Sequence, residues 1–98
     1  MGEVRAQAGQ EDALREFFVT RVAPEVAGGD GCLSCQVLQD QNDPGRLMVI
    51  EVWSNIEAHQ AAVKKIPPAM LQEGRALFGD SPAGAYYRVC YPAAHEPV

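Results

Sequence analysis

The 98-residue sequence has no long apolar run, no cluster of basic residues and only two histidines. No segment approaches the ~20 consecutive apolar residues that cross a bilayer, and the opening MGEVRAQAGQ does not have the pattern of a secretory signal. Eight basic residues are scattered among 13 acidic ones, which argues against nucleic acid or an anionic membrane as a partner. Three cysteines, an odd number, indicate free thiols and a cytoplasmic protein rather than a disulfide scaffold.

Familiar catalytic signatures are also absent. The chain contains no G-x-S-x-G, P-loop, G-x-G-x-x-G or H-E-x-x-H motif. Of the two histidines, His95 lies in PAAHEPV, which we expect to be a disordered tail, so only His59 falls within the predicted fold. Because one imidazole does not make a metal cluster, we predict no metal site.

The composition, with 47% hydrophobic residues, is that of a single globular domain. We place this domain at residues 1–98, with its core over about 4–91 and a tail over 92–98. A chain this short buries a modest core, and dimerisation is a common remedy. Alternating and helical spacings of apolar residues predict strands at 3–8, 32–40, 46–54 and 84–93, and helices at 10–29, 54–66 and 68–79. This order predicts a ferredoxin-like β-α-β-β-α-β sandwich of the α+β class, with four antiparallel strands.

Several local signals set the predicted boundaries. The turn residues of QNDPG should join the second and third strands as a hairpin. Pro24 should end or kink the first helix, because it lacks an amide donor and its ring clashes with the preceding turn. Ser54 and Glu57 have the spacing of a capping box, and Gly79 is placed to cap the end of the last helix.

The strand over 46–54 is apolar on both faces, whereas a strand with a solvated face shows a polar stripe. The predicted helices can cover only one face of the sheet. The other face therefore needs a partner, and a second copy of the chain is the simplest candidate. The two predicted faces are Leu47, Val49, Glu51 and Trp53 on one side and Met48, Ile50 and Val52 on the other.

Cys32 and Cys35 form a C-x-x-C motif within GDGCLSCQVL. On a regular strand, residues three apart point to opposite faces, so the two thiols should not converge on a metal or form a disulfide unless a bulge intervenes. A redox site would place the motif at a helix start, and a zinc site would need two more ligands. We therefore predict small apolar fillers, of which only one shares the face of Glu51 and Trp53. The register of the hairpin decides which, and Cys35 in that place would be a thiol in the pocket wall.

The segment EVWSNIEAH carries the strongest candidates for chemistry. Trp53, the only tryptophan, is either a core residue or the wall of a pocket between sheet and helices. Glu51 shares its face and must find a partner, either a structural bond to Arg88 or Arg75 or a role in acid–base chemistry. His59, on the apolar face of its helix, is either a satisfied core histidine or a proton carrier.

Over GCLSCQVLQDQNDPGRLMVIEVWSNIEAHQAAV the chain resembles the antibiotic biosynthesis monooxygenase (ABM) family, and the resemblance extends over about residues 4–91. The shared elements are a glycine-led strand, an Asp-Pro-Gly turn, an apolar strand ending in Glu-x-Trp and a capped helix. The resemblance implies a ferredoxin-like protomer that pairs into a dimeric α+β barrel. It also implies activities known in the family, which include oxidation of aromatic or quinol-type substrates by molecular oxygen without a cofactor, haem degradation and processing of a bacterial autoinducer.

The chain departs from some members at specific positions. Ala62 stands where haem-degrading members have a ligand histidine, and Val49 stands where quinone-forming members have an asparagine. The first strand has no asparagine and is short for the family, and the resemblance therefore implies a chain that begins late or is trimmed. We predict a homodimeric, cofactor-independent monooxygenase acting on a small aromatic or quinol substrate.

In that prediction Trp53 and His59 are the catalytic candidates. The substrate contacts would come from Trp53, Glu51, Phe17, Tyr86, Tyr87 and Arg88. The alternatives are a non-catalytic ligand-binding or stress-response module and, less favoured, a haem- or autoinducer-processing protein. A cavity beside Trp53 would favour an enzyme.

Overall fold

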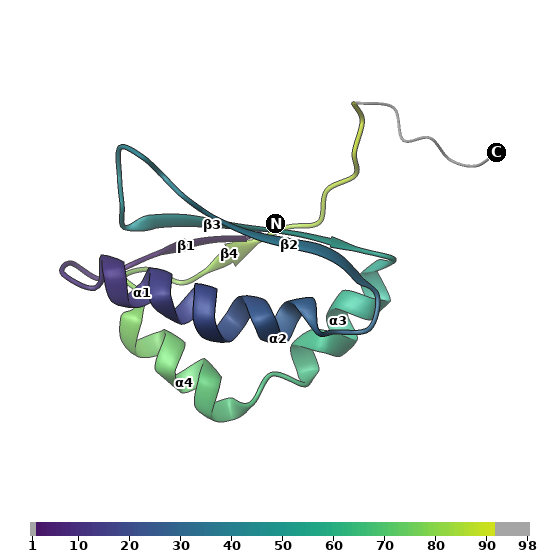
Figure 1. Ribbon diagram of the computed structural model, residues 1–98, viewed down its shortest axis with the longest axis horizontal. Coiled ribbons are helices and arrows are strands. Elements are labelled where there is room, and N and C mark those ends of the chain that lie inside the picture. The colour runs from purple at the N-terminus through teal and green to yellow at the C-terminus, as the bar shows by residue number, and fades with distance from the viewer. Residues whose placement is uncertain (1, 92–98) are drawn as a thin grey trace.

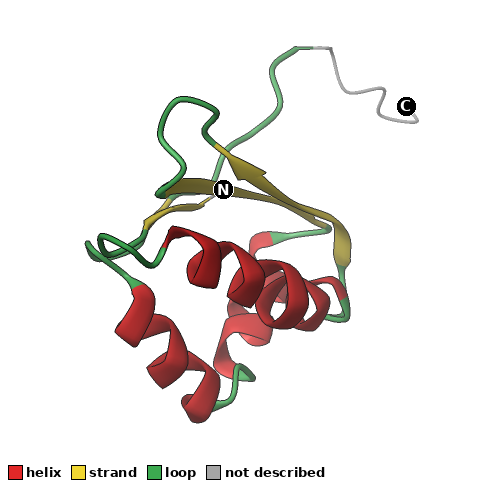
Figure 2. Cartoon of the chain, turned by 60° about the vertical axis from the view of Figure 1, so that its left-hand side comes forward, coloured by secondary structure: helices red, strands yellow, loops and turns green. Residues whose placement is uncertain are grey.

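The computed structural model describes residues 2–91, so the predicted tail with His95 lies outside the described residues. An antiparallel sheet of order β2-β3-β1-β4 is covered by helices on one face only (Figures 1 and 2). This arrangement confirms the ferredoxin-like α+β prediction. No helix in residues 2–91 is long and apolar enough to cross a membrane. The elements are β1 (Gly2–Arg5), α1 (Glu11–Phe17), η1 (Phe18–Val22), α2 (Ala23–Ala27), β2 (Cys32–Gln39), β3 (Arg46–Trp53), α3 (Ile56–Lys64), α4 (Pro68–Leu77) and β4 (Ala83–Gly84).

The core is small and lies under α1 and η1. Leu14 and Leu47 are fully buried, and they pack with Val4, Phe17 and Val49 among the buried residues. By contrast, α3 has no buried residue. The core therefore ends before it reaches α3, and that end of the molecule is open to a ligand.

Strand β3 alternates as its sequence predicts. Leu47 and Val49 are buried beneath the helices, while Val52, on the opposite face, is 44% exposed. At the hairpin end of the uncovered face, Arg46 bonds Glu3 at 2.6 Å and Asp40 at 3.3 Å. The hydrogen bond and charge of Arg46 hold the pKa of the Glu3 carboxyl below its ordinary value. The uncovered face is therefore polar at one end and apolar over the rest of β3.

Pro24 does not end the first helix. The chain passes from α1 through the π-helical η1 into α2, and the Ala23 N–H donates to the Phe18 carbonyl five residues back. A π turn removes the usual i−4 partner at this point, so Pro24 takes an N-terminal position of α2, where its missing N–H costs little. The proline shapes the helix without stopping it.

The capping box predicted at Ser54 is wrong by one residue. Asn55 is the N-cap of α3, and its side chain accepts from the Ala58 N–H at 2.7 Å. The Ser54 N–H instead donates to the Gly31 carbonyl at 2.8 Å, so Ser54 still belongs to the connection between β3 and α3. Gly31 has a φ of +87°, and a Cβ there would lie 2.7 Å from Ser54 Oγ. Only glycine therefore fits at position 31.

Helix α4 also ends differently from the prediction. Phe78 is its C-cap and is extended, and Gly79 donates its N–H to the Arg5 carbonyl at 2.7 Å. Phe78 forms a bridge with Ala6, beyond the end of β1. The chain passes from helix to sheet edge at once, so a glycine cap is not needed. Strand β1 is accordingly shorter than predicted.

The predicted strand over 84–93 is largely wrong within the described residues. Ala83 and Gly84 pair with Glu3 and Gly2. Because this register runs toward the first described residue of β1, residues 86–91 lie beyond the paired part of the sheet in the described chain. They are exposed, and Figure 1 shows the later part of the segment turning away from the sheet on the side opposite the helices.

Candidate functional site

A cavity of about 370 Å³ lies between α2, the end of β3 and α3. Glu51, Trp53 and His59 line it together, as do residues of the glycine-rich turn after α2. Glu51 and Trp53 share the covered face of β3, and the helix that begins after Asn55 brings His59 over them. The three residues of the EVWSNIEAH segment therefore meet at one wall.

These side chains form a connected polar group. The Trp53 indole Nε1 donates to Glu51 Oε1 at 2.9 Å, and His59 Nε2 lies 3.8 Å from the same oxygen. The other ring nitrogen, His59 Nδ1, is 2.8 Å from the Tyr86 hydroxyl. The His59 ring is edge-on to both Trp53 and Tyr86, with ring centroids 5.4 and 5.3 Å away. The predicted bond from Glu51 to Arg75 or Arg88 is wrong, because the nearer indole takes its place.

Residues 1–67 match the family described as antibiotic biosynthesis monooxygenase. The chain belongs to the antibiotic biosynthesis monooxygenase family. A member of that family from Chloroflexus aurantiacus J-10-fl is 31% identical, with 88% of this chain and 92% of that chain covered and a TM-score of 0.63.

Two further solved structures share the fold. The cofactor-independent oxygenase SnoaB from Streptomyces nogalater is 20% identical, with 93% and 92% of the two chains covered and a TM-score of 0.72. A Nitrosomonas europaea protein is 15% identical, with 93% and 88% covered and a TM-score of 0.81. A comparison with curated proteins returned no match.

Glycines make room for the tryptophan in this ABM protein. A Cβ on Gly29 would lie 3.0 Å from Trp53 Cη2 and 3.2 Å from the Val26 carbonyl oxygen. The indole therefore rests against the backbone of the turn. The sequence reasoning used the glycines only to mark a boundary and missed this contact. The run GGDG opposite a Trp-bearing strand was the available signal.

The C-x-x-C pair lies differently from the prediction. A β-bulge between Cys32 and Ser34 sets Cys32 opposite Trp53 and Cys35 opposite Glu51, so both thiols lie on the covered face. Burial, followed by the negative charge of Glu51, raises the pKa of both thiols. A raised thiol pKa is the reverse of what a reactive cysteine needs. Both thiols are free, and neither lines the cavity.

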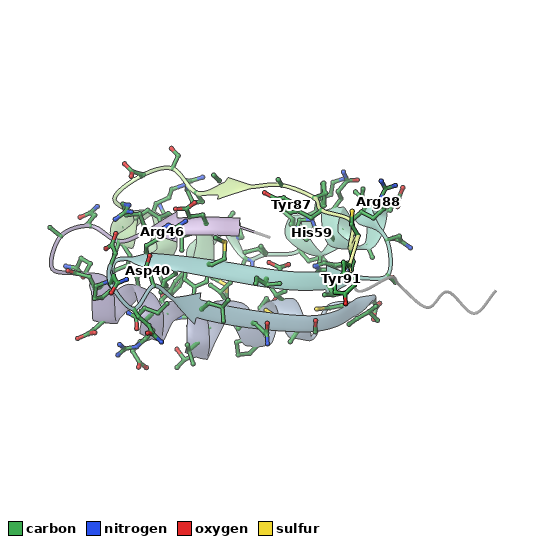
Figure 3. The ribbon with its side chains drawn as sticks, turned by 90° about the horizontal axis from the view of Figure 1, so that it is seen from above. Asp40, Arg46, His59, Tyr87, Arg88 and Tyr91 are labelled. Atoms are coloured by element: carbon green, nitrogen blue, oxygen red, sulfur yellow. The ribbon has the colours of Figure 1, made fainter. Side chains whose placement is uncertain are left out.

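The structure does not place the other predicted substrate contacts at this wall. Phe17 is buried and borders a second, apolar cavity of about 120 Å³ between η1 and α4. Tyr87, at 71% exposure, and Arg88 line neither cavity. Figure 3 shows both with His59 at one end of the sheet, opposite Asp40 and Arg46.

Charged residues missed by the sequence reasoning also line the cavity. Glu25, Asp30 and Lys65 contribute to its wall. No sequence pattern predicts this, since charged residues in such stretches are expected to face solvent. Within residues 2–91 no three potential metal ligands converge. Ala62, at the position of the haem ligand in other members, also lines the cavity, and its methyl group cannot ligate iron.

Proposed function

We propose that this chain is a cofactor-independent monooxygenase that oxidises a small aromatic or quinol-type substrate with molecular oxygen. The observation that carries the proposal is the cavity beside Trp53, where a carboxylate and an imidazole face each other across 3.8 Å. A volume of about 370 Å³ falls within the usual range for small-molecule sites. Family membership and the oxygenase named among its structural relatives support the same class of reaction.

The chemistry requires a proton carrier rather than a cofactor. A phenol or enol loses its proton to the Glu51–His59 pair, and the resulting electron-rich anion reduces oxygen. One oxygen atom enters the substrate at a ring carbon that bears one hydrogen, and that carbon becomes a carbonyl. The other oxygen atom leaves as water with that hydrogen and with the proton that the pair returns. The protein supplies the site, the orientation and the base. Trp53 offers an aromatic wall against which a planar substrate stacks.

The smaller cavity adds room for an apolar substituent. The two cavities share four lining residues, which are Val22, Glu25, Val26 and Ile66. The smaller one is otherwise lined by phenylalanines and aliphatic side chains. A substrate whose polar ring lies beside Glu51 would direct an alkyl group toward this second space.

The uncovered sheet face supports a homodimer. Met48, Ile50 and Val52 lie there without helices above them, and Val52 is 44% exposed. A second copy is the proposed cover, in a cytoplasmic protein with no nucleic-acid or membrane partner. Ile50→Lys should yield monomers by sedimentation, whereas Val63→Lys on α3 should not. An unchanged mass for Ile50→Lys would reject this interface.

Oxygen uptake with hydroxyanthrone- and naphthohydroquinone-like substrates tests the activity. Uptake should exceed the autoxidation measured without protein. His59→Gln should lower kcat by about 10²-fold or more, the usual contribution of a positioned proton carrier. Tyr87→Phe is the matched control and should leave the rate unchanged. Folded protein that consumes no oxygen across the panel would refute the proposal.

A non-catalytic ligand-binding module is the second candidate. It is favoured because the polar side chains of the cavity wall already bond one another: Trp53 donates to the Glu51 carboxylate. Calorimetric binding of a naphthoquinone without oxygen consumption would select it. A haem titration, with His59→Ala as control, should give no Soret shift dependent on this residue.

A further inference from the structure

Tyr86 reaches the site from an exposed segment. It lies just beyond β4 in the exposed stretch 85–91, and the residue is 52% exposed. Its hydroxyl is nevertheless 2.8 Å from His59 Nδ1, and its ring stands edge-on to the imidazole at 84°. Tyr86 does not line the cavity. It therefore contacts His59 from outside the substrate space.

The two nitrogens of His59 face different surroundings. Nε2 is directed to Glu51, whose side chain is 17% exposed and lines the cavity, whereas Nδ1 is directed to the exposed Tyr86 hydroxyl. The His59 side chain, at 28%, is intermediate. Exposure thus rises along the series from carboxylate to imidazole to phenol.

We propose that Glu51, His59 and Tyr86 form a proton path from the cavity to solvent, with Tyr86 as its outer end. The proposal rests on the proposed function, because that reaction takes a proton from the substrate inside the cavity and needs one back when water forms. Trp53 holds the inner end in place through its 2.9 Å bond to Glu51 Oε1. Tyr86 acts through His59 and is therefore a positioning residue, not a catalytic one.

The transfer conserves the number of protons and leaves the His59 proton on Nε2 instead of Nδ1; return of a proton along the same path, when water forms, restores the first tautomer. Glu51 takes the substrate hydroxyl proton and passes it to His59 Nε2. The imidazole then releases a proton from Nδ1 to the Tyr86 oxygen, and the Tyr86 hydroxyl proton moves to water. Since the 3.8 Å between Nε2 and Oε1 exceeds direct hydrogen-bond reach, a water or a small closure on substrate binding completes that step.

Nitrogen-15 NMR of the imidazole tests the connection without any substrate. The chain has two histidines, and loss of one set of signals in His59→Gln assigns the ring. Tyr86→Phe should shift the Nδ1 resonance, and Glu51→Gln should change the balance of protonation between the nitrogens. Tyr87→Phe, the neighbouring control, should do neither. If Tyr86→Phe leaves the His59 spectrum unchanged, the path does not exist.

Oxygen uptake then tests the role of the path. Tyr86→Phe should lower kcat by about ten- to hundredfold with KM unchanged, up to the lower end of what a positioned proton carrier contributes. Added imidazole buffer should restore part of kcat, because a small base can replace the missing outer end. A rise in KM with kcat unchanged would identify Tyr86 as a substrate contact and overturn the proposal. An inactive parent protein would reject the proposed function, while the NMR result would still decide whether the three residues are connected.

Discussion

The placement of Cys35 opposite Glu51 leads to a measurable change in thiol reactivity. The negative charge of Glu51 raises the pKa of the Cys35 thiol, as burial does more strongly. Replacing Glu51 with Gln removes the charge and keeps the shape. We expect the pKa of the thiol to fall while burial still holds it above its ordinary value. The thiolate fraction at neutral pH should therefore increase.

The size of the effect follows from the register. Directly opposed residues of an antiparallel pair have Cβ atoms about 5 Å apart. Two unit charges at about 5 Å in water interact by about 0.8 kcal/mol, and this value is a lower bound because the pair is partly buried. That is about a fourfold change in thiolate. Nucleophilicity falls as the pKa falls, so the net rate of disulfide exchange should rise by about twofold.

The assay is reaction with an aromatic disulfide reagent in a background of Cys32→Ser and Cys90→Ser, where Cys35 is the only thiol. Glu57→Gln makes the same change of charge on the first turn of α3 and is the control. A Glu51→Gln rate no greater than that of the control would show that the register or the electrostatic argument is wrong.

Three further outcomes are expected. Leu47→Ala should lower the free energy of unfolding in urea by about 2–5 kcal/mol, because the side chain is fully buried, and a loss well below this would mean that the core is packed differently. Asn55→Ala should lower the free energy of unfolding by about 0.5–2 kcal/mol and Ser54→Ala by less, since Asn55 caps α3. The opposite order would indicate that Ser54 is the N-cap. Arg46→Gln should destabilise the protein at neutral pH, where the lowered pKa of Glu3 contributes stability, and the difference should shrink once the pH falls below the ordinary pKa of this carboxyl and Glu3 becomes protonated; parallel curves would contradict the ion pair.

Features that depend on local periodicity could be predicted from the sequence. The period of two along β3 places Glu51 and Trp53 on one face, and helical spacing places His59 toward the sheet. The turn residues between β2 and β3 likewise mark the hairpin. Trp53 and Glu51 stand two residues apart, so their bond was also within reach of this reasoning.

Features that depend on one extra residue or on a distant partner could not be predicted from the sequence. The bulge beside Leu33 changes the face on which Cys32 lies, and nothing in the local composition predicts it. The tyrosines after Gly84 alternate as in a strand, but strand propensity becomes structure only where a neighbour supplies the ladder. The contact between Tyr86 and His59 joins residues 27 positions apart and depends on how that segment leaves the sheet.

The contact between Trp53 and the Gly29 turn also has a practical consequence. Trp53 is the only tryptophan among three tyrosines and three phenylalanines, and it lines the cavity. Light absorbed by indole alone therefore reports on a single place in the molecule. Intrinsic fluorescence can follow a ligand entering the cavity, without a label and with no other indole to dilute the signal.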